Sequence, residues 1–246
     1  MDNIGSIALS RMVAQQRAID VTAGNIANST TAGFQGERVI FSDWLVKQDA
    51  AGQPPGGRTV AYAQDRATYR DTRPGPQTQT GNPLDLAIGV DGFFSVQSPR
   101  GPRLTRSGHF ELSATGSIVD GDGNALLDTA GQPMQVGPTD GTLTVTADGS
   151  ISSVNGSIGR IGVIRPDDPQ KMKAEGSRLF NADGPTKPVA VPRISQGSLE
   201  ASNVQPTVEL NRMMNELREF QFTSQFIQSE ADRGQAAIDK IMAKRV

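Results

Sequence analysis

The sequence contains no cysteine and only one histidine, His109, among its 246 residues. Disulfides, thiolate metal sites and cysteine nucleophiles are therefore excluded, and so are metal sites that need two histidines from one chain. Aromatic residues make up only 5% of the chain, whereas glycine and proline number 27 and 15. This composition favours many short strands joined by tight turns in at least part of the chain.

A strong net charge and long apolar runs are also missing. Lys plus Arg (24) nearly balance Asp plus Glu (26), which argues against a nucleic-acid partner held by bulk electrostatics. No stretch approaches the ~20 apolar residues that cross a bilayer, so we expect no membrane insertion. The N-terminus, MDNIGSIALSRMVAQQ, has an early aspartate and Arg11 in place of an uninterrupted apolar core. We therefore expect no cleavable secretory signal.

The N-terminal region has the apolar period of a helix. One set of apolar residues, at three- and four-residue spacings, consists of Ile4, Ile7, Ala14, Ala18 and Val21. A second set lies beside it at ~100° per residue and consists of Ala8, Met12, Ile19 and Ile26. The apolar arc is wider than one partner helix requires, so we expect two neighbours.

A longer helix is expected from about Pro206 to Lys244, roughly 55 Å at 1.5 Å per residue. Apolar and small residues keep a three-four alternation along it, which is typical of a coiled-coil seam. The seam consists of Leu210, Met213, Leu217, Phe220, Ser224, Ile227, Ala231, Gly234, Ile238 and Ile241.

Two phenylalanines, Phe222 and Phe226, project from the face of this helix opposite the seam. Their spacing of four residues places them together on that face, where water would otherwise meet them. Two interpretations remain open: the rings pack under the chain's own middle domain, or they contact a neighbouring subunit.

The sequence predicts four segments and an α+β fold. Residues 1–34 form an N-terminal helix, and residues 35–83, rich in glycine, proline and glutamine, form an extended arm or linker. Residues 84–196 have a period of two with DG turns, which predicts an all-β domain. Residues 197–246 hold a C-terminal motif and the long helix, which pairs with residues 1–34. The predicted fold is a discontinuous domain of terminal coiled-coil-like helices plus a central all-β domain.

One acidic stretch imitates a calcium loop without completing it. Asp120, Asp122 and Asn124 alternate as the first ligands of such a loop would, but its sixth and twelfth positions are Ala125 and Gly131. A calcium loop needs glycine and a bidentate glutamate there. We therefore interpret the stretch as a β-turn.

The remaining candidates for chemistry are equally weak. His109 stands two residues from Ser107 on a predicted strand, which is not a nucleophile and base arrangement. Asp167 and Asp168 fall in a PDDP turn, where we expect solvated carboxylates. No phosphate loop or dinucleotide fingerprint occurs. We predict no catalytic residue, no cofactor and no metal site, and therefore no enzyme.

Three separate stretches resemble one protein family. VTAGNIANSTTAGFQ (21–35) resembles the N-terminal motif of bacterial flagellar rod and hook proteins, where a helix ends in N-x-A-N and a short turn leads to G-F. GSLEASNVQPTVELNRMM (197–214) resembles their C-terminal motif, with L-E-x-S-N-V before the long helix. GNPLDLAIGVDGFFSVQ, followed by LTRSGHFELSATGSIVD, is similar to their β-domain signature. The chain is thus identified as a member of this family.

The resemblance implies a structural subunit of the flagellar basal-body rod. In that family the terminal helices line the inside of a tubular, helically arranged axial structure, with the β-domain outside. The implied partners are copies of the chain, other proximal and distal rod subunits, and the flagellar type III export apparatus, which delivers the periplasmic part without a cleavable signal. The M-D start and the helix ending EADRGQAAIDKI resemble proximal rod proteins most. Distal rod proteins are the alternative.

Two other functions remain open. A soluble export cap or chaperone would use the terminal helices to clasp an exported partner. A wall-degrading β-domain would need two carboxylates that face one cleft at a defined separation.

We predict an assembly interface along both ends of the chain. Asn25 and Asn28 continue the register of the first apolar set, so their amides would specify register rather than maximise burial. Gly33 then allows a sharp exit, and Phe34 anchors the joint between helix and arm; an ordinary solvated helix end is the alternative. The predicted interface consists of Ile4, Ile7, Ala14, Ala18, Val21, Asn25, Asn28, Gly33, Phe34, Leu210, Met213, Leu217, Phe220, Phe222, Phe226, Ile227, Ile238 and Ile241.

Overall fold

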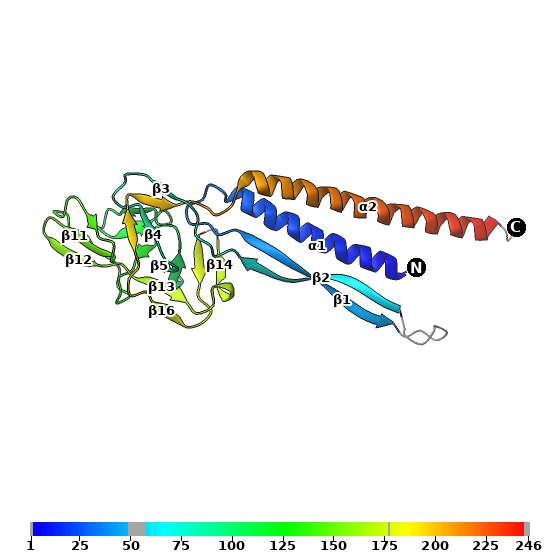
Figure 1. The fold of residues 1–246 in the computed structure, drawn as a ribbon, viewed down its shortest axis with the longest axis horizontal. Coiled ribbons are helices and arrows are strands. Elements are labelled where there is room, and N and C mark those ends of the chain that lie inside the picture. The colour runs from blue at the N-terminus through cyan, green and yellow to red at the C-terminus, as the bar shows by residue number, and fades with distance from the viewer. Residues whose placement is uncertain (1, 49–57, 177, 244–246) are drawn as a thin grey trace. The chain divides into compact units, whose positions relative to one another are not determined.

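The computed structural model describes residues 2–48, 58–176 and 178–243, with the backbone alone for residues 2–4, 41–48 and 58–66. The chain divides into two compact units. The first unit consists of Met1–Ile26, Glu37–Tyr69 and Pro206–Val246, and it contains both long helices (Figure 1). The second unit consists of Ala27–Gly36 and Arg70–Gln205 and is rich in β-strands. The predicted α+β class with a central β-rich region is confirmed.

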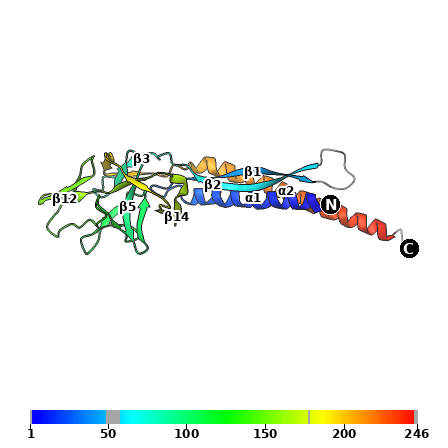
Figure 2. The ribbon, with the colours of Figure 1, turned by 90° about the horizontal axis from the view of Figure 1, so that it is seen from below.

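The helical unit pairs the two ends of the chain. Helix α1 (Asp2–Ala27) lies beside helix α2 (Pro206–Ala243), and the two run in opposite directions (Figures 1 and 2). With 26 and 38 residues, respectively, the helices differ in length by 12 residues, and the C-terminal end of α2 continues beyond the start of α1. The last turns of α2 therefore lack the neighbour that α1 gives to its first turns.

Helix α2 begins where its local signals predict. Pro206 occupies the first turn, where a residue without an N–H costs nothing, and Glu209 faces the positive end of the helix dipole. Lys240 lies in the last turn, at the negative end. The predicted start at Pro206 is confirmed, while the expected end at Lys244 lies just outside the described residues.

The predicted arm of residues 35–83 contains regular structure that its composition does not indicate. Strands β1 (Glu37–Gln48) and β2 (Arg58–Arg70) form a two-stranded sheet that lies along the helices of the first unit (Figure 2). Strand β3 (Gln77–Gln79) pairs with β18 (Ser198–Glu200) in the other unit. We predicted an extended arm or linker, and most of it is β-strand. Its polar residues are interspersed with β-branched and aromatic residues, which favour strands.

The β-rich unit contains one nine-stranded sheet and several small ones. Its main path runs β14-β15-β6-β5-β9-β8-β7, β13 also pairs with β5 and β16, and separate sheets hold β10-β11-β12 and β17-β4. A short 3-10 helix, η1 (Pro169–Lys171), precedes β14. The strands are β4 (Leu86–Ile88), β5 (Phe93–Ser98), β6 (Gly101–Thr105), β7 (Phe110–Leu112), β8 (Ile118–Asp120), β9 (Ala125–Leu126), β10 (Thr144–Val145), β11 (Ser150–Ser153), β12 (Gly156–Arg160), β13 (Val163–Pro166), β14 (Lys173–Glu175), β15 (Leu179–Asn181), β16 (Thr186–Pro188) and β17 (Ile194–Gln196).

Strand β5 separates two hydrophobic clusters because successive side chains point to opposite faces of a sheet. Phe94 belongs to the larger cluster and contacts Phe110 edge to face, with ring centroids 5.3 Å apart. Phe93 belongs to the smaller cluster and contacts Phe180 at 5.8 Å. Both faces of β5 are therefore core, which explains why five of its six residues are buried.

The β-rich unit is wider than the predicted 84–196. Besides Ala27–Gly36 it contains all of Arg70–Gln205, because β3 and β18 lie outside the predicted limits and pair with each other. The stretch LEASNV, which we placed in one segment with the long helix that follows it, consequently belongs to this unit.

Turn residues account for the acidic stretch at Asp120. Its Oδ1 accepts hydrogen bonds from the backbone N–H groups of Asp122 and Asn124, both at 2.9 Å. Gly123 has a φ of 84°, which the turn requires and L-residues disfavour. The predicted β-turn is confirmed.

Candidate assembly surface

Asn25 joins three elements of the helical unit. Its side chain is polar, but the residue is only 1% exposed. From the sequence we predicted that its amide sets the register of an apolar face. Its Nδ2 donates to the carbonyl of Glu37 (2.8 Å) and to Glu209 Oε2 (3.4 Å), and its Oδ1 accepts from the N–H of Glu37 (2.9 Å). One amide thus ties the end of α1 to the start of both β1 and α2.

Glu209 is the buried charge of this junction. It is fully buried, and its Oε2 accepts a hydrogen bond from Arg38 Nη1 at 2.7 Å. Burial alone would raise the pKa of Glu209, but the hydrogen bond and charge of Arg38, with help from Arg212 and Asn25, lower it below its ordinary value. Its other oxygen, Oε1, has no hydrogen-bond partner among the described residues.

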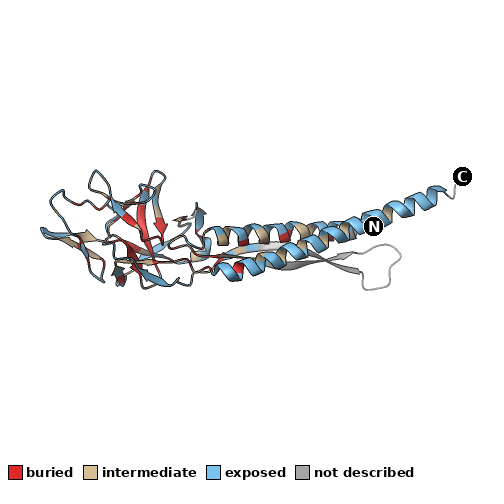
Figure 3. Cartoon of the chain, turned by 90° about the horizontal axis from the view of Figure 1, so that it is seen from above, coloured by how far each residue is buried: buried red, intermediate tan, exposed pale blue. Residues whose placement is uncertain are grey.

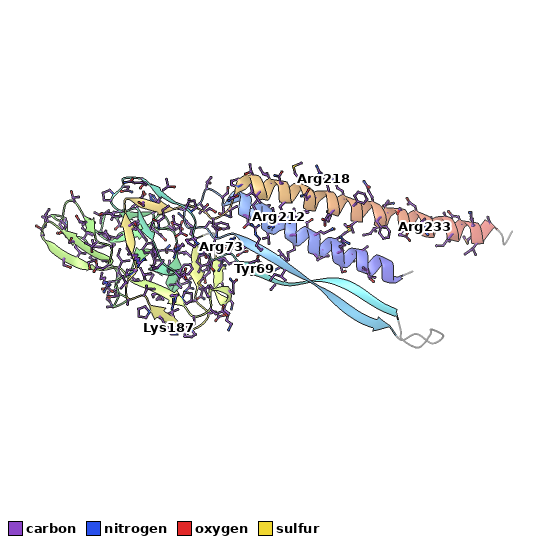
Figure 4. The ribbon with its side chains drawn as sticks, in the orientation of Figure 1. Tyr69, Arg73, Lys187, Arg212, Arg218 and Arg233 are labelled. Atoms are coloured by element: carbon purple, nitrogen blue, oxygen red, sulfur yellow. The ribbon has the colours of Figure 1, made fainter. Side chains whose placement is uncertain are left out.

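A second carboxylate, Glu216, lies two turns further along α2 under opposite influences. Burial raises its pKa above the ordinary 4.5, and the charges of Glu209 and Glu219 act in the same direction, against a hydrogen bond with Thr22 and the charge of Arg212. Glu216 and Arg212 line a cavity of about 280 Å³ between α1, α2, β1 and β2, with Tyr69 at the end of β2 (Figure 4).

The pKa of Glu216 predicts a pH dependence. A raised pKa means that the folded state binds the proton more tightly, so Glu216 lowers the free energy of unfolding as the pH rises above 4.5. We expect Glu216→Gln to raise the free energy of unfolding at pH 7 and to change it little at pH 4. Denaturant unfolding followed by helical circular dichroism measures both. Asp239→Asn, on the exposed end of α2, is the control, and an equal gain at both pH values would contradict the assignment.

The face of α2 that packs within the unit only partly matches the predicted seam. Met213, Phe220, Ile227 and Gly234 are half-buried, as the seam requires. The alternate positions are shifted by one residue: Glu209 is buried, and Glu216, Thr223 and Glu230 are half-buried. In their place we predicted Leu210, Leu217, Ser224 and Ala231, all of which are exposed. Coiled-coil geometry itself stays a prediction.

The exposed part of the predicted seam has two separate explanations. Ile238 and Ile241 continue the α1-facing stripe past the start of α1, and they are 52% and 65% exposed. Leu210 and Leu217 lie on one flank of that stripe and are 44% and 39% exposed. Both groups remain available to another molecule, and most of α2 is exposed (Figure 3).

Helix α1 has the wide apolar face that we predicted. Ala14 and Ala18 are buried, as is Ala8 from the second set, while Ile7 and Val21 are half-buried. The side chain of Ile4 lies outside the described residues.

Phe222 and Phe226 line an open apolar groove on the other flank of α2. Their exposed fractions are 78% and 47%, so the described part of the chain buries neither ring. The groove has a volume of about 690 Å³ and is completed by Ile7, Ala8 and Arg11 of α1. The two phenylalanines are thus not opposite α1, as we expected, but beside it.

The exit from α1 has the sharp turn that we expected. Asn28 accepts hydrogen bonds from Thr31, at its carbonyl (3.1 Å) and at Oδ1 (3.3 Å). Gly33 has a φ of 70° and donates its N–H to the carbonyl of Glu200 (2.8 Å). Phe34 is half-buried, and its carbonyl accepts from the N–H of Asn203 (3.3 Å).

The polar residues of the helix pairing were missed in the sequence. Gln15, Thr22 and Glu209 are all at least nine-tenths buried, and both amide atoms of Gln15 lack a partner among the described residues. The signal was present in α1: Gln15, Ala18, Thr22 and Asn25 keep the three-four spacing when polar residues are counted with apolar ones.

Sites for other chemistry are sparse over the described ranges. His109 Nδ1 lies 2.7 Å from Asp85 Oδ1, and its Nε2 lies 3.5 Å from Glu111 Oε1, so the ring stands between two carboxylates. No three His, Asp or Glu side chains of the described residues gather closely enough to hold a metal ion. In the same ranges, no helix combines the length and apolarity that a bilayer span needs.

Three parts of the chain match known protein families. Residues 6–35 match the family described as "Flagella basal body rod protein", and residues 87–153 match "Flagellar hook protein FlgE/F/G D1 domain". Residues 195–240 match "Flagellar basal body rod FlgEFG protein C-terminal". The matches occur in the α1 region, the β-rich unit and the α2 region, in that order.

Similar proteins cover almost the whole chain. The flagellar basal-body rod protein FlgF of Caulobacter vibrioides is 35% identical over 98% of both chains. FlgF of Mesorhizobium japonicum is 31% identical over 97% of both. FlgG of Bacillus subtilis is 32% identical over 89% of this chain and 91% of its own. The chain therefore belongs to the family of flagellar basal-body rod proteins.

Proposed function

We propose that the chain is a FlgF-type structural subunit of the flagellar rod, which polymerises through α1 and α2 into the torque-transmitting shaft. Its partners are copies of itself and other proximal and distal rod subunits. It is exported through the flagellar type III apparatus and occupies the periplasmic part of the basal body. It performs no chemistry.

The observation that carries this proposal is the uncovered apolar surface of the helical unit. Phe222 and Phe226 lie on one flank of α2, and Leu210 and Leu217 lie on the other. Full burial of each such side chain is worth roughly 1.5–3 kcal/mol. Surfaces on two flanks cannot both be covered by one neighbour, so they favour an assembly with several contacts per subunit.

Polymer growth also explains the unequal helices. Ile238 and Ile241 continue the packing stripe of α2 past the start of α1, and both are exposed, which favours a contact with another molecule there. When a patch at one end of a subunit fits a different patch on the next copy of that subunit, the two copies form a head-to-tail contact. Such contacts generate open helical assemblies when the rotation does not close a ring.

Incorporation into rods tests the proposal. We expect Phe222→Ser to reduce the amount of the subunit in isolated basal bodies by at least about tenfold. Loss of one phenylalanine ring that is buried between subunits would weaken assembly by more than ~1.4 kcal/mol, which corresponds to a factor of ten. Val154→Ser is the matched control, because Val154 is also 78% exposed but lies in the β-rich unit. The measurement is the copy number per basal body after washing with detergent.

The two variants separate the possible outcomes. Normal incorporation of Phe222→Ser would show that the groove is not an assembly surface. A parent chain that washes out of basal bodies would contradict the rod assignment itself and favour a soluble export cap.

A further inference from the structure

Three short segments of the β-rich unit lie next to three of the four points where the chain passes between the two units. The chain crosses after residues 26, 36, 69 and 205. The segments are residues 33–36, which precede β1, residues 71–76, which follow β2, and residues 200–204, which precede α2. Figure 4 labels Arg73 in the second of them.

Asn203 ties all three segments together with one side chain. Its Oδ1 accepts the N–H of Gly36 at 2.8 Å. Its Nδ2 donates to the carbonyls of Asp71 (2.8 Å) and Arg73 (2.9 Å). The carbonyl of Gly36 accepts the N–H of Asp71 (2.8 Å), so the three segments close a ring of hydrogen bonds.

Glu200 anchors this ring to the sheet of the β-rich unit. Its Oε2 accepts from Arg106 Nε at 2.6 Å, and both side chains are at least 96% buried. Its Oε1 accepts the N–H of Gly75 (3.1 Å). Arg106 also donates to the carbonyls of Ile88 (3.3 Å), Val90 (2.9 Å) and Gly92. Glu200 and Arg106 thus form an ion pair in which each side chain also has backbone hydrogen-bond partners. A buried ion pair with such additional hydrogen bonds holds a fixed geometry.

The backbones at this place are packed without room for side chains. A Cβ on Gly33 would lie 2.3 Å from the carbonyl carbon of Arg106. A Cβ on Gly75 would lie 1.9 Å from the carbonyl oxygen of Ala201. Close contact between main chains leaves each segment little freedom to slide against the others.

We infer that Glu200 and Asn203 form a mechanical clamp, in which these three chain segments move as one body. Separate flexible links would bend and twist before they transmitted force. Segments tied side by side share the load among several hydrogen bonds, two of them to charged groups. The clamp rests on the proposed function, because its use is to carry torque within a rod subunit.

Amide hydrogen exchange of the purified chain tests the clamp directly. We expect Asn203→Ala to speed exchange of the Gly36 and Asp71 amides by at least about tenfold, while amides of β5 keep their protection. Asn155→Ala is the matched control: the Asn155 amide also makes three hydrogen bonds, to Thr139 and Asp140, but in an exposed turn. Unchanged exchange at Gly36 and Asp71 would overturn the clamp.

If Asn203→Ala does not fold, Asn203→Asp replaces it, because Asp retains the acceptor for Gly36 and lacks only the donors. Faster exchange at Asp71 with continued protection at Gly36 is then expected, and protection at both overturns the clamp.

Swimming under load tests the mechanical role separately. In cells that carry only the variant subunit, we expect Asn203→Ala to enter rods in normal copy number but to lose at least half of its relative swimming speed in a viscous medium. Asn155→Ala should swim like the parent at every viscosity. Equal load tolerance of the two variants would overturn the mechanical role. Absence of the parent chain from rods would instead overturn the proposed function, and the exchange result on the purified chain would stand independently.

Discussion

Replacing Gly33 by alanine is expected to lower the free energy of unfolding of the β-rich unit by about 3 kcal/mol. Two effects add up. The φ of 70° at Gly33 is unfavourable for any L-residue with a side chain, and a new methyl group would meet the Arg106 backbone at 2.3 Å. Amide hydrogen exchange of β5, in the core of this unit, followed as a function of denaturant concentration, measures the loss.

Gly131→Ala separates the two effects. Gly131 has a similar φ of 79°, but nothing lies within 4 Å of an added Cβ. We therefore expect this control to lose only about 1 kcal/mol, the cost of the backbone conformation alone. Equal losses for the two variants would mean that the contact between Gly33 and Arg106 is looser than the structure shows.

The second large effect is expected at Glu209. Glu209→Ala removes the carboxylate that binds both Arg38 and Asn25, at the point where α1, β1 and α2 meet. Loss of one partner from a buried ion pair costs several kcal/mol, but the Arg38 side chain is 26% exposed and regains some hydration. We expect the helical unit to lose about 2 kcal/mol of unfolding free energy. Helical circular dichroism during urea unfolding measures it.

Glu230→Ala is the control for a carboxylate on the same helix. Glu230 pairs with Arg233 at 2.6 Å, but this is a surface pair between residues three apart. Such pairs contribute about 0.5 kcal/mol or less, so the control should unfold nearly as the parent does. If Glu209→Ala also behaves like the parent, the buried junction contributes nothing to the pairing of the helices.

Local signals predicted a large part of the fold. Pro206 marks the start of α2 because its chemistry suits a first turn wherever the helix lies. The turn at Asp120 was equally predictable, since its carboxylate bonds N–H groups only two and four residues away. Features of this kind need no knowledge of the rest of the chain.

Distant partners explain what the sequence could not predict. Glu209 was expected at the N-terminal end of a helix, where an acid is also stable in water, but its burial depends on Arg38 and Asn25, 171 and 184 residues away. The predicted seam took Leu217 over Glu216 for the same reason. An apolar residue is the better choice for a seam until a partner such as Thr22 is known.

The assembly role of the predicted interface residues is a separate matter from their place in one chain. Ala14, Ala18 and Asn25 are buried within the helical unit, so they reach another subunit only through the geometry they impose. Leu217, Phe222 and Ile241 remain exposed and are the residues through which direct contact is proposed.

Pairing of the first and last segments has a consequence for the order in which the molecule can form. A polypeptide that emerges N-terminus first holds α1 and β3 long before α2 and β18, their partners, become available. Neither unit can close until more than four-fifths of the chain has been delivered, because Asn203 is residue 203 of 246. Contacts between such remote positions form late and slowly. Both units therefore stay incomplete while most of the chain is being delivered. The incomplete chain remains unfolded enough to pass through a narrow channel.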